Sequence, residues 1–146
     1  MPGVTDLYSD DILTLAQSLR DEALAAPDAT VRRVSKLCGS EVELDLTLID
    51  RVVTGFAQRV RACALGQASA AILKATVKGA TCAELTSARD ALHAMLKSDG
   101  PPPEGRFAAL SRLKGVRDYP ARHQSVLLPW EAAAEACREA CLQPPD

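Results

Sequence analysis

Apolar residues recur along the first part of the chain with the period of a helix. The segment from Asp6 to about Ala26 carries them at spacings of four, three and four, at Tyr8, Ile12, Leu15 and Leu19. Such spacing places one apolar stripe on one face of a helix. The pattern therefore predicts an amphipathic surface helix that packs against the rest of the molecule.

The pattern then changes to a period of two. Apolar and polar side chains alternate over residues 41–48, with Val42, Leu44, Leu46 and Leu48 on one face and Glu41, Glu43, Asp45 and Thr47 on the other. This alternation predicts a half-buried strand with its acidic face toward water. A second extended run, from Val52 to Ala62, follows a turn around Asp50, which favours an antiparallel hairpin. A third strand is expected between Ala26 and Lys36.

Helical patterns return in the second half of the chain. Small, helix-favouring residues fill 66–78 and end at Gly79, a common residue just past a helix. Thr81 and Glu84 then form a capping box ahead of an apolar stripe, which predicts a second helix that ends at the loop 98–105.

The last region, 107–142, repeats apolar residues at helical spacing, at Val126, Trp130, Ala133, Cys137 and Cys141. Pro129 is expected to kink or break this helix. Together the patterns predict an α+β fold in which several helices pack on a small antiparallel sheet of about three strands. We expect one domain over residues 1–146, because the length suits a single core.

Composition narrows the classes of partner. The chain has 17 basic and 19 acidic residues, so its formal charge of −2 gives no support for nucleic acid or an anionic membrane as partner. No apolar run approaches the roughly 20 residues of a membrane span, and the first residues lack a signal-peptide pattern. We expect a cytoplasmic protein.

The five cysteines are expected to be thiols, because the cytoplasm is reducing. None of them forms a CxxC pair, so any metal site has to be assembled from distant segments. Cys63 lies just before a helix predicted to begin near Gly66, whose amino terminus favours a thiolate, and Arg59 and Arg61 add positive charge nearby. The alternative is a small cysteine that only packs.

Four strings carry a resemblance to a known family. They are LYSDDIL near the start, LCGSEVELDLTL (37–48), ACALGQASAAILKATVKGAT (62–81) and LKGVRDYPARHQSVLLPWEAA (113–133). In order and spacing the chain resembles the U-type iron–sulfur cluster assembly proteins, namely the amino-terminal domain of NifU, IscU and SufU. The segment 79–113 and the strings after it look more like SufU than IscU. The resemblance implies a SufE/NifU-like fold.

The resemblance also implies a ligand set that this chain keeps only in part. The first and second family cysteines correspond to Cys38 and Cys63, whereas Ser40 stands in place of the family aspartate and Ser125 in place of the third cysteine. Thiolates are strong ligands for zinc and iron, and a serine hydroxyl competes poorly. The resemblance therefore implies iron, zinc or a nascent cluster bound through Cys38 and Cys63, or a metal-free protein because of the serines.

The remaining titratable candidates are weaker. IscU-type members have a histidine where this chain has Gln124, and His123 lies one residue earlier. His123 is either a replacement ligand or an exposed residue, and the exposed position is the preferred prediction. His93 is expected at the surface. Core packing is the favoured role for Cys137 and Cys141, and Cys82 is expected to be structural.

Two functions follow from the resemblance. The first is a scaffold or sulfur-relay protein, rather than a turnover enzyme, that accepts persulfide sulfur from a cysteine desulfurase at Cys63 or Cys38 and works with other assembly proteins. The second is a non-catalytic adaptor that has lost metal binding. A hydrolase built on Ser125 and His123 is set aside, since no nucleophile-elbow pattern or carboxylate orienter accompanies them.

Overall fold

The computed structural model describes residues 9–37 and 39–142. Three strands come early in the chain and most of the helical structure comes late. The elements in chain order are α2 (Asp10–Ser18), β1 (Ala29–Val34), β2 (Glu41–Ile49), β3 (Val52–Arg61), α3 (Ala64–Thr76), α4 (Cys82–Lys97), the 3-10 segments η1 (Gly105–Asp118) and η2 (Pro120–Arg122), and α5 (His123–Leu142).

The sheet is antiparallel with strand order β1-β2-β3, which confirms the predicted hairpin and the third strand. Leu44 of β2 faces Val31 of β1 and Gln58 of β3 in the register. The hairpin turn has positive φ at both central residues, 52° at Asp50 and 66° at Arg51. This is the backbone pattern of a type I′ turn, whose twist suits a two-residue hairpin even without glycine or asparagine.

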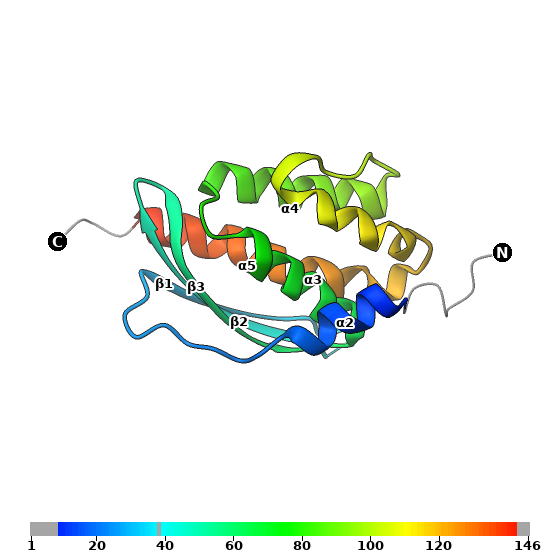
Figure 1. The fold of residues 1–146 in the computed structure, drawn as a ribbon, viewed down its shortest axis with the longest axis horizontal. Helices are drawn as coiled ribbons and strands as arrows, with labels where there is room; N and C mark the ends of the chain where they lie inside the picture. Colours follow the sequence, from blue (N-terminus) through cyan, green and yellow to red (C-terminus); the bar gives the residue numbers. More distant parts are fainter. Residues whose placement is uncertain (1–8, 38, 143–146) are drawn as a thin grey trace.

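The helices gather over the sheet, as Figure 1 shows, and α2 packs against α3. The helix α5 lies between the sheet and the helices α3 and α4. It contacts β1, β2, α3 and α4, and η1 lies against α3 and α4. Several helices on a three-stranded antiparallel sheet confirm the predicted α+β class. Within the described residues, no helix is long and apolar enough to span a bilayer.

The centre of the core is Trp130 of α5, which is fully buried. Its ring meets Phe107 edge to face at a centroid distance of 5.4 Å, a favourable aromatic geometry. The indole Nε1 donates to Ser69 Oγ at 3.1 Å, and Ser69 Oγ donates to the carbonyl of Val126 at 2.6 Å. These polar contacts fix α3 and α5 in one relative position.

Pro129 does not break α5, which continues from His123 to Leu142. A proline inside a helix cannot donate a hydrogen bond to the carbonyl four residues earlier. In α5 that carbonyl belongs to Ser125. The Ser125 carbonyl therefore does not receive the usual helical hydrogen bond, and Ser125 is a residue predicted for the site.

The first helix is shorter than predicted. Its start at Asp6 and its residue Tyr8 lie outside the described residues, and its end is at Ser18 rather than near Ala26. Leu19 turns into extended backbone, with ψ 137°. The chain then follows the sheet, where Glu22 N donates to the carbonyl of Gln58 at 3.1 Å. Hydrogen bonds to the sheet thus replace the last predicted helical turns.

The acidic face of β2 was predicted to face water, but one of its residues does not. Asp45 is only 3% exposed. Its carboxylate accepts hydrogen bonds from Arg59 Nη2 at 2.9 Å, Thr30 Oγ1 at 2.8 Å and Leu24 N at 3.0 Å. Burial by itself raises the pKa of Asp45, but these donors outweigh it and hold the pKa below its ordinary value. The segment after α2 covers this part of β2, which the strand pattern alone does not reveal.

Candidate functional site

Three residues predicted for the site meet in the structure although they are distant in sequence. Ser40 Oγ donates to Ser125 Oγ at 3.2 Å, and Cys63 Sγ lies 3.3 Å from the same oxygen. Ser40 and Ser125 are 3% and 1% exposed, and Cys63 is half-buried. The structure therefore brings these three residues together. Cys38, the fourth, lies outside the described residues.

Each of the three residues stands at the end of an element. Ser40 directly precedes β2, Cys63 is the residue before the first turn of α3, and Ser125 lies in the first turn of α5. The helix α3 begins at Ala64, two residues earlier than predicted, so Cys63 is its N-cap. The thiol makes no capping hydrogen bond and stays available to the Ser125 hydroxyl.

Gly66 allows Ser125 to approach α3. A Cβ atom at Gly66 would lie 2.3 Å from Ser125 Oγ and 2.7 Å from the Ala62 Cβ, both closer than packed atoms allow. Glycine costs about 1 kcal/mol relative to alanine inside a helix. The close approach of α3 and α5 gives this glycine a structural reason.

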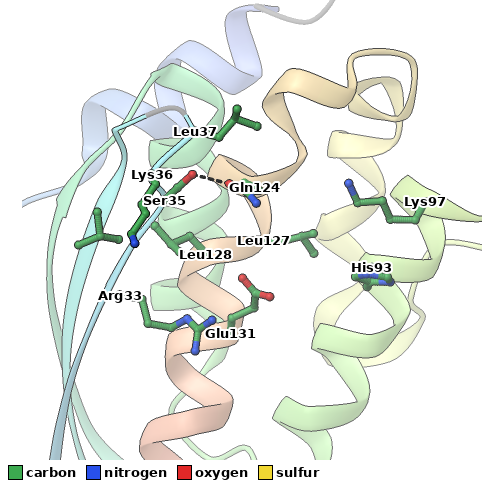
Figure 2. A pocket seen from close by; sticks show the side chains of 11 residues that line it. Arg33, Ser35, Lys36, Leu37, His93, Lys97, Gln124, Leu127, Leu128 and Glu131 are labelled. Carbon is green, nitrogen blue, oxygen red and sulfur yellow. Dashed lines mark hydrogen bonds between the residues drawn. The ribbon is translucent and has the colours of Figure 1, made fainter.

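The turn that carries Ser40 is fastened to α5. Ser35 N donates to the Ser40 carbonyl at 2.8 Å and Gly39 N to the Ser35 carbonyl at 2.8 Å. Ser35 Oγ donates to Gln124 Oε1 at 2.6 Å, the bond drawn in Figure 2. Gly39 has a φ of +72°, a conformation that glycine adopts without strain. Gln124, which holds the family histidine's place, thus anchors the turn beside the site.

The preferred prediction of an exposed His123 is wrong, because this residue is only 3% exposed. Its Nε2 lies 2.9 Å from the carbonyl of Val116 and 3.1 Å from that of Arg117. Carbonyl oxygens only accept, so Nε2 carries the hydrogen and is not free for a metal. His123 starts α5 and joins it to η1, since the two carbonyls that contact its ring belong to η1.

Arg59, whose positive charge was expected beside Cys63, instead pairs with two acidic residues of β2. Its guanidinium pairs with Glu43 at 2.8 Å and with Asp45 at 2.9 Å. The hydrogen bond to Asp45 is the main cause that raises the pKa of Arg59, against the effect of its burial. Arg59 therefore stabilises the sheet and the covering segment. Arg61 is exposed.

The other predicted residues divide into confirmed and corrected positions. Cys137 is 1% exposed within the core and His93 is at the surface, as predicted. Cys82 is half-buried against the core, in agreement with a structural place. Cys141 is exposed, so its predicted core position is wrong. It lies in the last turn of α5, where its neighbours Arg138, Glu139 and Leu142 are also exposed.

The donor set does not fit a closed metal site as far as the chain is described. No three His, Cys, Asp or Glu side chains among residues 9–37 and 39–142 are arranged to hold an ion. The meeting point offers one thiol and two hydroxyls, whereas a structural zinc site takes four nitrogen, thiolate or carboxylate ligands.

A groove of about 800 Å³ opens next to the turn that carries Ser40. Figure 2 shows Lys97 and His93 of α4 on one side and the end of β1 on the other, with Leu127, Leu128 and Glu131 of α5 between them. Basic side chains outnumber acidic ones in its lining, which includes Arg33 and Lys36. The bond between Ser35 and Gln124 joins this groove to the site.

Comparisons with known proteins agree with the fold. No protein-family model matches the chain. The solved structure of a nitrogen-fixing NifU-like protein (N-terminal) from Brucella abortus is 48% identical, covers 97% of this chain and 99% of its own, and superimposes with a TM-score of 0.94. The chain belongs to the NifU-like family of iron–sulfur cluster assembly scaffold proteins.

Two further relatives have lower identity. The iron–sulfur cluster assembly scaffold protein IscU of Thermotoga maritima is 28% identical over 135 residues, which are 91% of this chain and 94% of IscU. The SufU structure of Fervidobacterium islandicum AW-1 is 20% identical, covers 92% of this chain and 99% of its own, and has a TM-score of 0.84. At that identity the SufU likeness concerns the fold alone.

Sequence reasoning missed the part played by Gly66 and by the Ser35–Gln124 bond. A glycine inside an otherwise helix-favouring run is the one local signal of a close approach, and it marks Gly66. The Ser35–Gln124 bond joins residues far apart in sequence, so no local pattern reveals it.

Proposed function

We propose that this chain is a sulfur-accepting accessory protein of iron–sulfur cluster assembly, in which Cys63 receives sulfur from a cysteine desulfurase. The observation that carries the proposal is the position of Cys63, a half-buried thiol before α3 and 3.3 Å from a serine hydroxyl. Membership of a scaffold family supplies the biological setting. Cys38 is proposed as a second acceptor thiol.

The arrangement of hydroxyls suits an accepting thiol. Ser125 Oγ accepts the proton of Ser40, so its own hydrogen can point toward the Cys63 sulfur. The unpaired backbone N–H groups in the first turn of α3 also favour negative charge at the position of Cys63. Both groups can stabilise the negative charge that the Cys63 sulfur carries when it acts as a nucleophile in the proposed transfer.

The transfer step is a displacement at sulfur. The Cys63 thiolate attacks the outer sulfur of a desulfurase persulfide, a new S–S bond forms on Cys63, and the desulfurase cysteine leaves as a thiolate. No oxidant or metal is needed. Iron, zinc or a nascent cluster would then be cargo delivered to the persulfide, not a resident cofactor.

The groove beside the site supports docking of a partner with an acidic surface. Lys36 and Lys97 are exposed on its two sides, and charge complementarity steers such encounters. We propose that the cysteine desulfurase and other assembly proteins approach this side. We place the protein in the cytoplasm and treat residues 1–146 as one unit of function.

The experiment that tests the proposal measures sulfur bound to the chain. A cysteine desulfurase loaded with L-cysteine is mixed with the reduced chain, and sulfane sulfur is quantified after removal of free sulfide. We expect Cys63→Ala to lose most of it and Cys82→Ala, the matched control at the opposite end of the molecule, to keep it. Equal sulfur on both variants would overturn the proposal. Glutathione persulfide as a second donor separates a docking defect from a defect in the thiol.

A second function, a non-catalytic adaptor, is favoured by one observation. Ser40, Ser125 and Cys63 are hydrogen-bonded to one another, so the hydroxyls that replace the family's aspartate and third cysteine contact each other and the thiol. Metal and acid-labile sulfide analysis of anaerobically purified protein separates the two. Metal that disappears in both Cys38→Ala and Cys63→Ala supports a working site, whereas metal-free protein that accepts no sulfur supports the adaptor.

A further inference from the structure

Three thiols gather at the end of α5 that lies away from the candidate site. Cys82 is the first residue of α4, and Cys137 and Cys141 are one turn apart near the end of α5. Residues four apart on a helix lie on the same face. Figure 1 shows the start of α4 and the end of α5 at the same end of the molecule.

Both cysteines of α5 lie close enough to the Cys82 thiol to influence its pKa. The three residues differ in access to water, since Cys141 is exposed, Cys82 is half-buried and Cys137 is 1% exposed. Burial raises the pKa of Cys82 and of Cys137, so both rest as protonated thiols. Cys141 is therefore the member of the cluster that a solvent-borne oxidant reaches first.

Metal binding is not the chemistry that this cluster favours. As far as the structure is described, no three His, Cys, Asp or Glu side chains are arranged to hold an ion, and the three thiols are included in that statement. Two neighbouring thiols with unequal exposure instead have the arrangement of an attacked cysteine and its resolving partner.

We propose that Cys82 and Cys141 form a reversible disulfide when a peroxide oxidises the exposed Cys141 thiol. The Cys141 sulfur attacks one peroxide oxygen, the O–O bond breaks, and Cys141 becomes a sulfenic acid while water is released. The Cys82 sulfur then attacks the sulfenic sulfur, the S–O bond breaks, and hydroxide leaves with the Cys82 proton as water. Two thiols lose two electrons and one hydrogen peroxide becomes two waters.

The disulfide would join the start of α4 to the end of α5 and leave Cys63 untouched at the other end. A cross-link between distant residues restricts the unfolded chain, so we expect oxidation to raise the Tm by about 10 °C. In a reducing compartment such a bond is transient and responds to peroxide, which makes it a redox-sensitive modification rather than a permanent staple. It is independent of the proposed sulfur acceptance.

The test uses the full chain, reduced and then treated with limiting hydrogen peroxide. Free thiols are alkylated, and the peptides are mapped by mass spectrometry without reduction. We expect a peptide pair that links Cys82 to Cys141 in the wild type, in Cys63→Ala and in Cys137→Ala, and its loss in Cys82→Ala and Cys141→Ala. Dithiothreitol should remove the link together with the rise in Tm.

Several results overturn the proposal. They are a fully reduced chain after peroxide treatment, a link that joins Cys82 to Cys137, or disulfides that only join two molecules. If Cys82→Ala fails to fold, Cys82→Ser replaces it, because serine keeps the size of the side chain and cannot form the bond. Circular dichroism of the reduced variants checks that each one is folded before oxidation.

Discussion

The two ends of α5 differ in the side chains that gather there, which are mainly serine hydroxyls at its start and cysteine thiols at its end. At its start, Ser125 brings a hydroxyl to Ser40 and Cys63, so the described group has two serines and one thiol. At its end, Cys137 and Cys141 face Cys82, and the group has three thiols. A count of cysteines alone would favour the end of α5 that lies away from the candidate site.

Surroundings, rather than residue type, separate the two ends. Cys63 stands before the first turn of α3, with the Ser125 hydroxyl 3.3 Å from its sulfur. Cys82 also begins a helix, but burial dominates there and raises the pKa of its thiol. Cysteine at two helix starts thus meets a serine hydroxyl in one case and, in the other, a place against the core whose burial raises the pKa of the thiol.

The largest expected effect comes from making the start of α5 resemble its end. Changing Ser125→Cys together with Ser40→Asp restores the donors that the family resemblance implies, so we expect zinc affinity to rise at least about tenfold. Isothermal titration of the anaerobic, reduced protein with zinc measures the change. A double variant with unchanged affinity would show that the two serines are not what limits metal binding.

The next effect concerns the glycine that lets the two helices approach. Gly66→Ala places a methyl group 2.3 Å from Ser125 Oγ and 2.7 Å from the Ala62 Cβ. We expect the free energy of unfolding to fall by about 2 kcal/mol, as for other overpacked core positions. Urea unfolding measures it, with Ala75→Ser on the exposed side of α3 as the control. Equal stability of the two variants would contradict the close approach.

A change away from both ends tests whether their thiol chemistry is local. Asp45→Asn removes a buried carboxylate that is bonded to Arg59, and we expect a loss of about 2 kcal/mol at neutral pH. The folded pKa of Asp45 is lowered, so its stabilisation is present above the ordinary value near 4 and lost as the pH falls through the folded pKa.

Thermal unfolding from neutral pH down to about 3 follows this difference. The Tm gap between wild type and Asp45→Asn should be constant above about pH 5 and shrink below about pH 4. Alkylation rates of Cys63 and Cys141 should be the same in both proteins at neutral pH. A changed rate at either cysteine would mean that the sheet and the thiol sites are coupled.

The smallest effect is expected from the groove beside the start of α5. Lys36→Glu with Lys97→Glu reverses two exposed charges, and we expect association with a cysteine desulfurase to slow several-fold at low salt. Stopped-flow association at two salt concentrations measures it. Arg112→Glu, an exposed charge reversal on η1 outside the groove, is the control and should leave the rate higher than the paired variant does.

Period and turn chemistry gave most of the fold. The alternation in 41–48 placed β2, and Thr81 with Glu84 placed the start of α4, because both signals are local to a few residues. The predicted helix to Ala26 failed because hydrogen bonds to β2 and β3 outweigh helical propensity beyond Ser18. Tertiary contacts of that kind leave no periodic trace.

The site was predictable only through the family resemblance. Ser40, Cys63 and Ser125 belong to three elements and carry no common local motif, yet they lie within hydrogen-bonding distance. The surroundings of His123 were not predictable, since its ring contacts carbonyls of η1, which lies earlier in the chain. Sequence spacing indicates a helix face, but not which neighbouring segment covers it.

The most direct test of sulfur acceptance locates the transferred sulfur on the chain. After reaction with a cysteine desulfurase and L-cysteine, alkylated peptides are mapped by mass spectrometry for the mass of one added sulfur atom. We predict the added sulfur on the peptide with Cys63 and none on those with Cys82, Cys137 or Cys141. Added sulfur confined to those three cysteines, with Cys63 unmodified, would contradict the account.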